Sequence, residues 1–144
     1  MMTETTIGSA AISPSAGDQD AVASIPRRVV AAWAAHDAAA FAELFTEQGS
    51  MVLPGVFQKG RDEIRSFMTG AFAGPYQNTR VTGTPVSVEF FSDATAVLIT
   101  EGGVLHQGES EVAAERAIRA SWVVVKENGQ WLLAAYQNSP REKR

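Results

Sequence analysis

The sequence predicts an α+β fold in which helices pack on one face of a curved antiparallel sheet. Three observations support this prediction. Apolar residues recur at helical spacing before Pro75, segments typical of β-strands follow it, and short polar turns separate neighbouring strand segments. Helices in the first half of a chain and strands in the second half indicate the α+β class.

Three helices are expected before Pro75. The first covers residues 18–36 and either starts near Ser24 or is kinked at Pro26. Its apolar stripe is formed by Val22, Ile25, Val29 and Trp33. Asp37 offers a side-chain oxygen as the N-cap of a short second helix over residues 38–45. The third helix, RDEIRSFMTGAF at residues 61–72, has the clearest stripe, consisting of Ile64, Phe67, Met68, Ala71 and Phe72.

Strands are expected between the second and third helices and again after Pro75. The segment SMVLP predicts a short strand at residues 50–54, and GVFQKG predicts a turn-rich connection at residues 55–60. Later strands are predicted over residues 81–91, 95–107, 117–126 and 131–138. The turns FFSDAT and KENGQW each join two of these strands, which we therefore expect to form antiparallel hairpins.

Composition predicts one globular domain over residues 18–139, between a flexible tail at 1–17 and a short basic tail at 140–144. The chain has 144 residues, of which 45% are hydrophobic, enough to enclose a core and a ligand-sized cavity. Its net charge of −4 and scattered basic residues give no electrostatic footprint for nucleic acid. The absence of cysteine excludes disulfides, thiolate nucleophiles and sulfur metal sites. Without an apolar membrane span or a convincing secretory signal, we expect a cytoplasmic protein with no membrane partner.

Three stretches of this chain resemble the nuclear transport factor 2-like (NTF2-like) superfamily, and within it the SnoaL-like, SgcJ/EcaC-type proteins. They are VAAWAAHDAAAFAELFTEQGSMVLP, GRDEIRSFM and RASWVVVKENGQWLLAAYQNS. The resemblance runs from about Asp18 to Ser139. It implies a cone-shaped α+β barrel whose helices close a bent sheet around a deep pocket. It also implies a homodimer assembled through the sheet and a setting in enediyne polyketide biosynthesis.

The chemistry of this family depends on the pocket, because the scaffold carries enzymes and binding proteins alike. In SnoaL-type cyclases and ketosteroid isomerases, a pocket carboxylate removes a proton next to a carbonyl. Glu101 is the candidate base in this chain, and Arg119 is its candidate catalytic partner. The EQG at residues 47–49 departs from the acidic pair that many relatives carry before the first strand, which argues against a simple isomerase. No G-x-G-x-x-G follows a strand and the two histidines are far apart, so we expect no cofactor and no metal.

The facing of the last two strands depends on the turn between them. A three-residue turn places Lys126 opposite Gln130, whereas a two-residue Asn-Gly turn shifts the register by one. We expect the three-residue turn, because it directs both Lys126 and Gln130 towards water. Arg119, with Glu101 or a ligand oxygen as its partner, then faces the concave side. The outer face is too apolar to stay wet and is the expected dimer interface, formed by Trp122, Val124, Leu132 and Tyr136.

The expected pocket is elongated and mostly apolar. Its expected substrate-binding residues are Trp33, Phe41, Phe67, Met68, Phe72, Tyr76, Ser121, Leu133 and Gln137. Two functions remain open. One is a cofactor-free acid–base enzyme of the cyclase or isomerase type that acts on a polyene or enediyne-core intermediate. The other is a non-catalytic protein that shields such an apolar, polyketide-derived molecule or assists a polyketide synthase.

Overall fold

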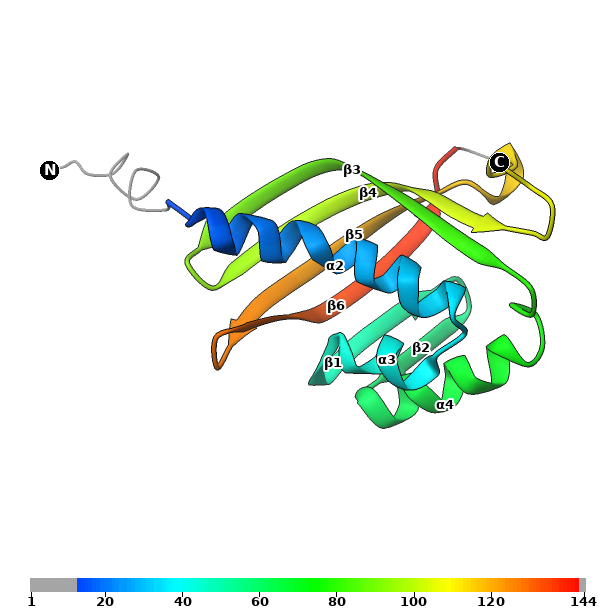
Figure 1. Cartoon of the computed structure of the whole chain (residues 1–144), viewed down its shortest axis with the longest axis horizontal. Helices are drawn as coiled ribbons and strands as arrows, with labels where there is room; N and C mark the ends of the chain where they lie inside the picture. The colour runs from blue at the N-terminus through cyan, green and yellow to red at the C-terminus, as the bar shows by residue number, and fades with distance from the viewer. Residues whose placement is uncertain (1–12, 143–144) are drawn as a thin grey trace, which may run out of the picture.

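The computed structural model describes residues 13–142, which form three α-helices packed on one face of a curved, six-stranded sheet (Figure 1). The helices are α2 (Ala16–Ala34), α3 (Ala38–Glu43) and α4 (Arg61–Phe72). The strands are β1 (Phe45–Leu53), β2 (Val56–Lys59), β3 (Arg80–Ser92), β4 (Thr95–Leu105), β5 (Ile118–Glu127) and β6 (Gln130–Pro140). A short 3-10 helix, η1 (Ala114–Arg116), precedes β5. The predicted α+β class is confirmed.

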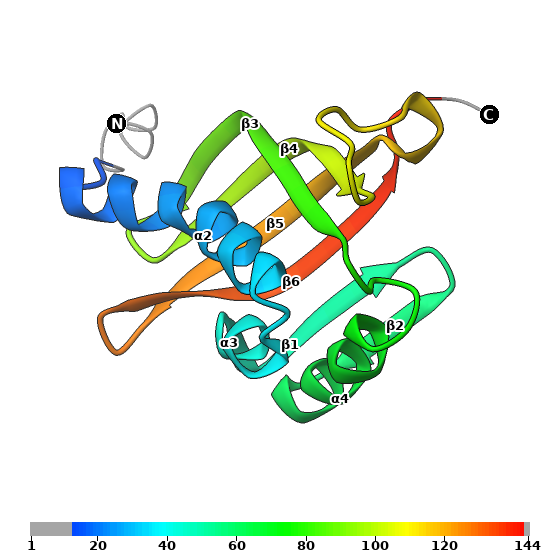
Figure 2. The ribbon, with the colours of Figure 1, turned by 45° about the vertical axis from the view of Figure 1, so that its right-hand side comes forward.

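The sheet has the strand order β2-β1-β6-β5-β4-β3, with β1 parallel to β6 and all other neighbours antiparallel. Its edge strands β2 and β3 do not pair with each other, so the sheet curves without closing into a barrel. Helix α2 crosses the concave face over β3 to β6, and α4 lies beside β1 and β2 (Figure 2). The three helices thus cover the face that a closed barrel would enclose.

Two of the expected helices differ from the observed ones at their ends. Helix α2 begins at Ala16 because the Ser15 hydroxyl caps it, accepting a hydrogen bond from the Asp18 amide at 3.0 Å. It continues through Pro26 without interruption. The expected tail at 1–17 therefore extends too far; residues 1–12, like 143–144, lie outside the described residues. Helix α3 has the predicted Asp37 cap but ends before Phe45, which begins β1.

The predicted helix over residues 61–72 is confirmed as α4, but the connection before it is not simply a turn. Residues 56–59 form strand β2, which pairs with β1 through Leu53 opposite Val56. Gly55 takes a φ of 75° in the turn between these strands, where a residue without a Cβ is favoured.

The turn between β5 and β6 has two residues, so the expected three-residue turn is wrong. Asn128 and Gly129 have φ values of 52° and 78°, and Glu127 lies opposite Gln130. Positive φ at both central residues defines the type I′ hairpin turn, for which Asn-Gly is the preferred dipeptide. The register near the turn is therefore shifted by one residue from the expected one.

A bulge changes the register of this hairpin a second time. Val124 lies opposite Leu133, whereas Val123 lies opposite Ala135, so Ala134 is an extra residue on β6. Because side chains alternate between the two faces of a strand, an extra residue exchanges the faces of everything beyond it. The bulge decides which residues of β6 meet the helices.

One charged side chain joins the start of α2 to the far end of the sheet. The Asp18 carboxylate accepts hydrogen bonds from the Trp131 indole at 3.0 Å and from the Lys126 ammonium at 3.1 Å. The bond from Trp131, followed by that from Lys126, holds the pKa of Asp18 below its ordinary value of 3.8. Asp18 thus fixes the helix to the β5–β6 hairpin.

We expect Asp18→Asn to lower the urea midpoint of unfolding at neutral pH. Because the folded-state pKa lies below the ordinary 3.8, the ionised carboxylate stabilises the fold above that pH. This contribution is lost as the pH falls through the lower, folded-state pKa, so the difference between natural protein and variant should shrink in acid. Asp20→Asn, on the exposed side of the same helix, is the control. If the urea midpoints of the wild-type protein and Asp18→Asn differed by the same amount at every acid pH, the ionised Asp18 carboxylate would not be the stabilising group.

Candidate functional site

A cavity lies between the helices and the concave face of the sheet. Its volume is about 90 Å³, several times the roughly 10–15 Å³ that one water needs. Its lining is mostly apolar, and the aromatic residues in it are Trp33, Phe41, Phe45, Tyr76, Trp122 and Tyr136. Enclosed apolar pockets with a few polar groups are the usual form of small-molecule sites.

Some of the expected pocket residues line this cavity, namely Trp33, Phe41, Met68, Tyr76 and Leu133. Two of the expected pocket residues on α4, Phe67 and Phe72, do not line it. Phe67 lies beside Asp62 and Glu63 in a shallow surface groove. Phe72 is buried behind the lining, with its ring centroid 5.5 Å from that of Trp33. The apolar stripe of α4 therefore includes residues that do not reach the cavity.

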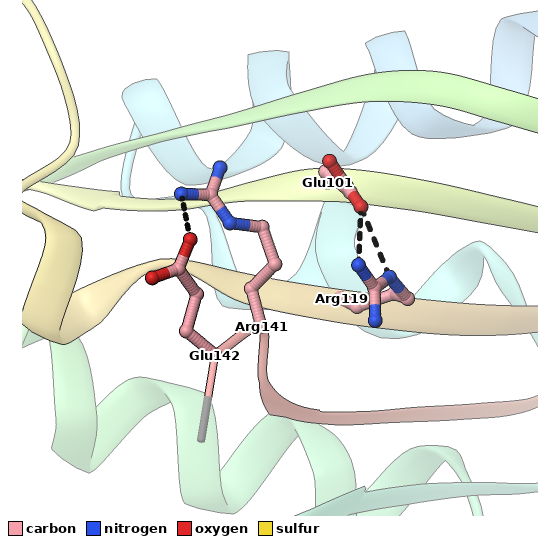
Figure 3. Close-up of polar contacts among 4 residues, drawn as sticks. All are labelled: Glu101, Arg119, Arg141 and Glu142. Atoms are coloured by element: carbon pink, nitrogen blue, oxygen red, sulfur yellow. Dashed lines mark hydrogen bonds and ion pairs between the residues drawn. The ribbon is translucent and has the colours of Figure 1, made fainter. Parts of the chain in front are cut away.

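The candidate catalytic pair lies on the other face of the sheet, which corrects the expected placement. Arg119 and Glu101 are opposite one another on β5 and β4, and they alternate with the buried residues Ala120 and Thr100. Glu101 Oε2 accepts hydrogen bonds from Arg119 Nε at 3.0 Å and Nη2 at 2.7 Å (Figure 3). The two side chains are 51% and 30% exposed, and α2 passes behind the sheet in this view. The pair is an exposed ion pair outside the cavity.

Ser121 and Gln137 also face outwards, because they lie opposite one another in the same alternation. Conversely, the expected interface residues Trp122, Val124 and Tyr136 face the helices. Trp122 and Tyr136 line the cavity, and Val124 is fully buried in the core. Leu132 lies opposite Val125, in the row that faces away from the cavity. The Asn-Gly turn and the bulge at Ala134 account for these corrections.

Both indole groups of the cavity are held by internal hydrogen bonds. Trp122 Nε1 donates to Thr100 Oγ1 at 2.9 Å, and Trp33 Nε1 donates to Thr79 Oγ1 at 2.9 Å. The Trp122 ring also meets Tyr136 edge to face, with a centroid distance of 4.9 Å. These contacts fix the two rings and thereby define this part of the cavity wall.

The Tyr136 hydroxyl is the polar group best placed to meet a ligand. Asn138 Nδ2 donates to this oxygen at 3.0 Å, which leaves the tyrosine's own proton available for an acceptor. Burial raises the pKa of Tyr136 above its ordinary value of 10.0, and burial does the same for Tyr76. Both phenols are therefore neutral at physiological pH and keep a proton that can be donated in a hydrogen bond.

No charged side chain and no histidine contributes to the lining of this cavity within the described part of the chain. Residues 13–142 contain no cluster of three or more His, Asp or Glu side chains that could hold a metal ion. Among the helices of residues 13–142, none has the length and apolarity needed to cross a membrane. The arrangement can hold a neutral molecule and donate a hydrogen bond to it.

Sequence reasoning missed Tyr136, Asn138, Trp122 and Thr100 as members of this site. A signal for the facing of Trp122 was present in the Asn128–Gly129 dipeptide, which favours a two-residue turn and so places Val124 opposite Leu133. That signal alone does not find the site, because the bulge at Ala134 has no comparable mark in the sequence.

Comparison with known proteins shows which domain family and which solved structures this chain is similar to. The model of the SnoaL-like domain family matches residues 14–137. A solved domain of unknown function with a cystatin-like fold, from Nostoc punctiforme PCC 73102, is 26% identical over 90% of this chain and 80% of its own, with a TM-score of 0.83. An NTF2-like protein with a cystatin-like fold from Novosphingobium aromaticivorans is 18% identical over 89% of this chain and 84% of its own, with a TM-score of 0.78. These likenesses confirm the NTF2-like fold. No curated protein matches the sequence significantly.

Proposed function

This chain belongs to the SnoaL-like domain family, and we propose that it binds a neutral, apolar small molecule that carries a carbonyl oxygen. One observation carries the proposal: Tyr136 lines the apolar cavity, and because Asn138 donates to its hydroxyl oxygen, the hydroxyl proton is free to be donated. Asn138 holds the hydroxyl oxygen and thereby orients that proton. The ligand's hydrocarbon part gains from leaving water by about 25 cal/mol for each Å² buried.

The absence of charge from the lining supports a neutral ligand. An ionised ligand would lose its water without gaining an opposite charge, at a cost of several kcal/mol. Arg119 cannot supply that charge, because it lies on the outer face paired with Glu101. A carbonyl oxygen, by contrast, needs one donor, which Tyr136 provides.

The same geometry favours binding over acid–base catalysis. Removal of a proton next to a carbonyl needs a basic group within reach of that proton. Glu101, the candidate base, is on the wrong face of the sheet for this role. One observation favours a second function of the cyclase or isomerase type, because the Tyr136 donor would also stabilise an enolate oxygen formed from the carbonyl.

The proposed biological setting is enediyne polyketide biosynthesis. It is supported by the resemblance of residues 18–139 to SgcJ/EcaC-type proteins and by the aromatic lining, which suits part of an unsaturated polyketide chain. In this setting the protein shields a reactive intermediate or assists the synthase that releases it. A carrier acts in proportion to its amount, whereas an enzyme acts at a small fraction of its substrate.

The proposed partner in the assembly is a second copy, bound through the outer face of the sheet. This face carries half-buried apolar rows on strands β4, β5 and β6, formed by Val97, Ile99, Val123, Val125 and Ala135. Val52 and Phe57 extend the apolar surface on β1 and β2, where they are 37% and 62% exposed. Two copies related by a two-fold axis would cover the same rows in each other.

Tyr136→Phe tests the proposed recognition of the carbonyl. We expect natural protein to bind 2-acetylnaphthalene more tightly than 2-ethylnaphthalene, as measured by quenching of tryptophan fluorescence. The variant should lose about tenfold in affinity for the ketone and little for the hydrocarbon, because it loses one hydrogen bond. Arg119→Leu, altered on the outer face, is the control and should bind both compounds as natural protein does. Equal affinities for the ketone in natural protein and Tyr136→Phe would refute the role of the hydroxyl.

Reconstitution with an enediyne polyketide synthase separates the carrier from the enzyme. We expect the recovered polyene to rise in proportion to added protein and to level off near equal amounts, with no new product by liquid chromatography and mass spectrometry. Conversion to a new product by about one hundredth of an equivalent would instead demonstrate catalysis, since a carrier cannot turn over.

Val123→Glu tests the proposed dimer face. It places a charge at the centre of the apolar rows, so we expect sedimentation velocity to show a monomer where natural protein shows a dimer. Ala34→Glu, at the exposed end of α2, is the control and should remain dimeric. A folded Val123→Glu protein that dimerises as tightly as natural protein would exclude this face.

A further inference from the structure

Three glycines, Gly83, Gly102 and Gly103, line the cavity where β3 pairs with β4. Gly83 lies directly opposite Gly102. Glycine in the interior of a strand destabilises it relative to alanine, because glycine loses more conformational freedom on folding. The presence of glycine at each of these three positions therefore needs a physical explanation.

Two of the three glycines are required by the backbone. A Cβ on Gly102 would collide with the carbonyl oxygen of Thr82 on the neighbouring strand. Gly103 has a φ of 153°, and a Cβ there would lie 2.8 Å from the carbonyl oxygen of Arg116. Neither position accepts a side chain without a shift of the main chain.

Gly83 has no such requirement. Its φ is outside the positive range that favours glycine, and the two register shifts of β3 lie further along, between Pro85 and Ser87 and between Phe90 and Ser92. The nearest neighbours of a Cβ at this position would be Thr100 Oγ1 at 3.8 Å and Thr100 Cβ at 3.9 Å, which are ordinary van der Waals contacts. Thr100 is the buried cavity residue that accepts the Trp122 hydrogen bond, so a side chain at position 83 would project into the cavity. The missing side chain keeps the cavity open rather than relieving the backbone.

We propose that Gly83 sets the width of the cavity and selects flat, unsaturated ligands over thicker, saturated ones. This inference rests on the proposed function, because it assigns the shape of the same ligand. The lining also includes Val29, Val30 and Trp33 of α2, the helix that crosses the concave face over β3 and β4 (Figure 2). Trp33, Tyr76 and Trp122 offer rings on which a conjugated chain or fused ring system can lie. A ligand of this kind packs against the bare backbone at Gly83 while its carbonyl meets Tyr136.

The test compares 2-acetylnaphthalene with its saturated, thicker counterpart 2-acetyldecalin, which carries the same carbonyl. Natural protein should prefer the flat ketone. Gly83→Val should weaken binding of that ketone by about tenfold or more, because its isopropyl group overpacks the space that the ligand uses. Gly83→Ala should give a smaller loss. Thr84→Val, opposite Glu101 on the outer face of the same strand, is the matched control and should leave both affinities unchanged.

Urea unfolding of Gly83→Ala supplies a readout independent of ligand, and its unfolding free energy should equal or exceed that of natural protein. A marked loss of stability would show a backbone requirement and overturn the inference. The inference about Gly83 would be overturned if Gly83→Val and the wild-type protein bound 2-acetylnaphthalene with equal affinity. It would also be overturned if the wild-type protein bound 2-acetyldecalin more tightly than 2-acetylnaphthalene. Either result would leave the proposed pocket function intact. Failure of natural protein to bind either ketone would refute the pocket function, and the inference with it.

Discussion

The register of the β5–β6 hairpin determines which side chains of the central sheet meet the helices. The type I′ turn at Asn128–Gly129 fixes the pairing near the turn, and the extra residue Ala134 shifts it further along. Side chains alternate between faces and the extra residue exchanges them on β6, so these two features place Tyr136 and Asn138 in the cavity and Gln137 outside. The hydrogen-bonding pattern between β5 and β6 therefore determines which of their side chains face the helices and which face outwards.

The outer face of the sheet and the cavity lining differ in whether they carry charged side chains. The outer face carries the Arg119–Glu101 ion pair, where water and the partner charge both stabilise the guanidinium. The cavity lining contains phenol, hydroxyl, amide and indole groups, each of which can be buried at moderate cost when it is hydrogen bonded. Such an interior tolerates an apolar guest without needing an ion to balance it.

The sequence supports the fold much better than it supports the site. The ends of α4 follow from periodicity, because one buried face imposes a regular spacing on the apolar residues. The four later strands follow from strand-type segments bounded by polar turns. The facing of β5 does not follow, since Trp122, Val123, Val124 and Val125 are apolar on both sides and fit either orientation. The cavity depends on that facing and on a bulge, and both arise from pairing between strands rather than from the composition of either strand.

The parallel pairing of β1 with β6 has a consequence for folding. Strand β6 lies between β1 and β5 in the sheet, so it joins the N-terminal helices and the β1–β2 hairpin to the three strands β3 to β5. Met51 and Tyr136, for example, are neighbours across this junction although most of the domain separates them along the chain. Contacts between such distant residues form slowly, because a long loop must close before they stabilise the chain. During synthesis the ligand cavity can be completed only after β6 has left the ribosome, and until then the edges of β1 and β5 are open to other chains and to chaperones.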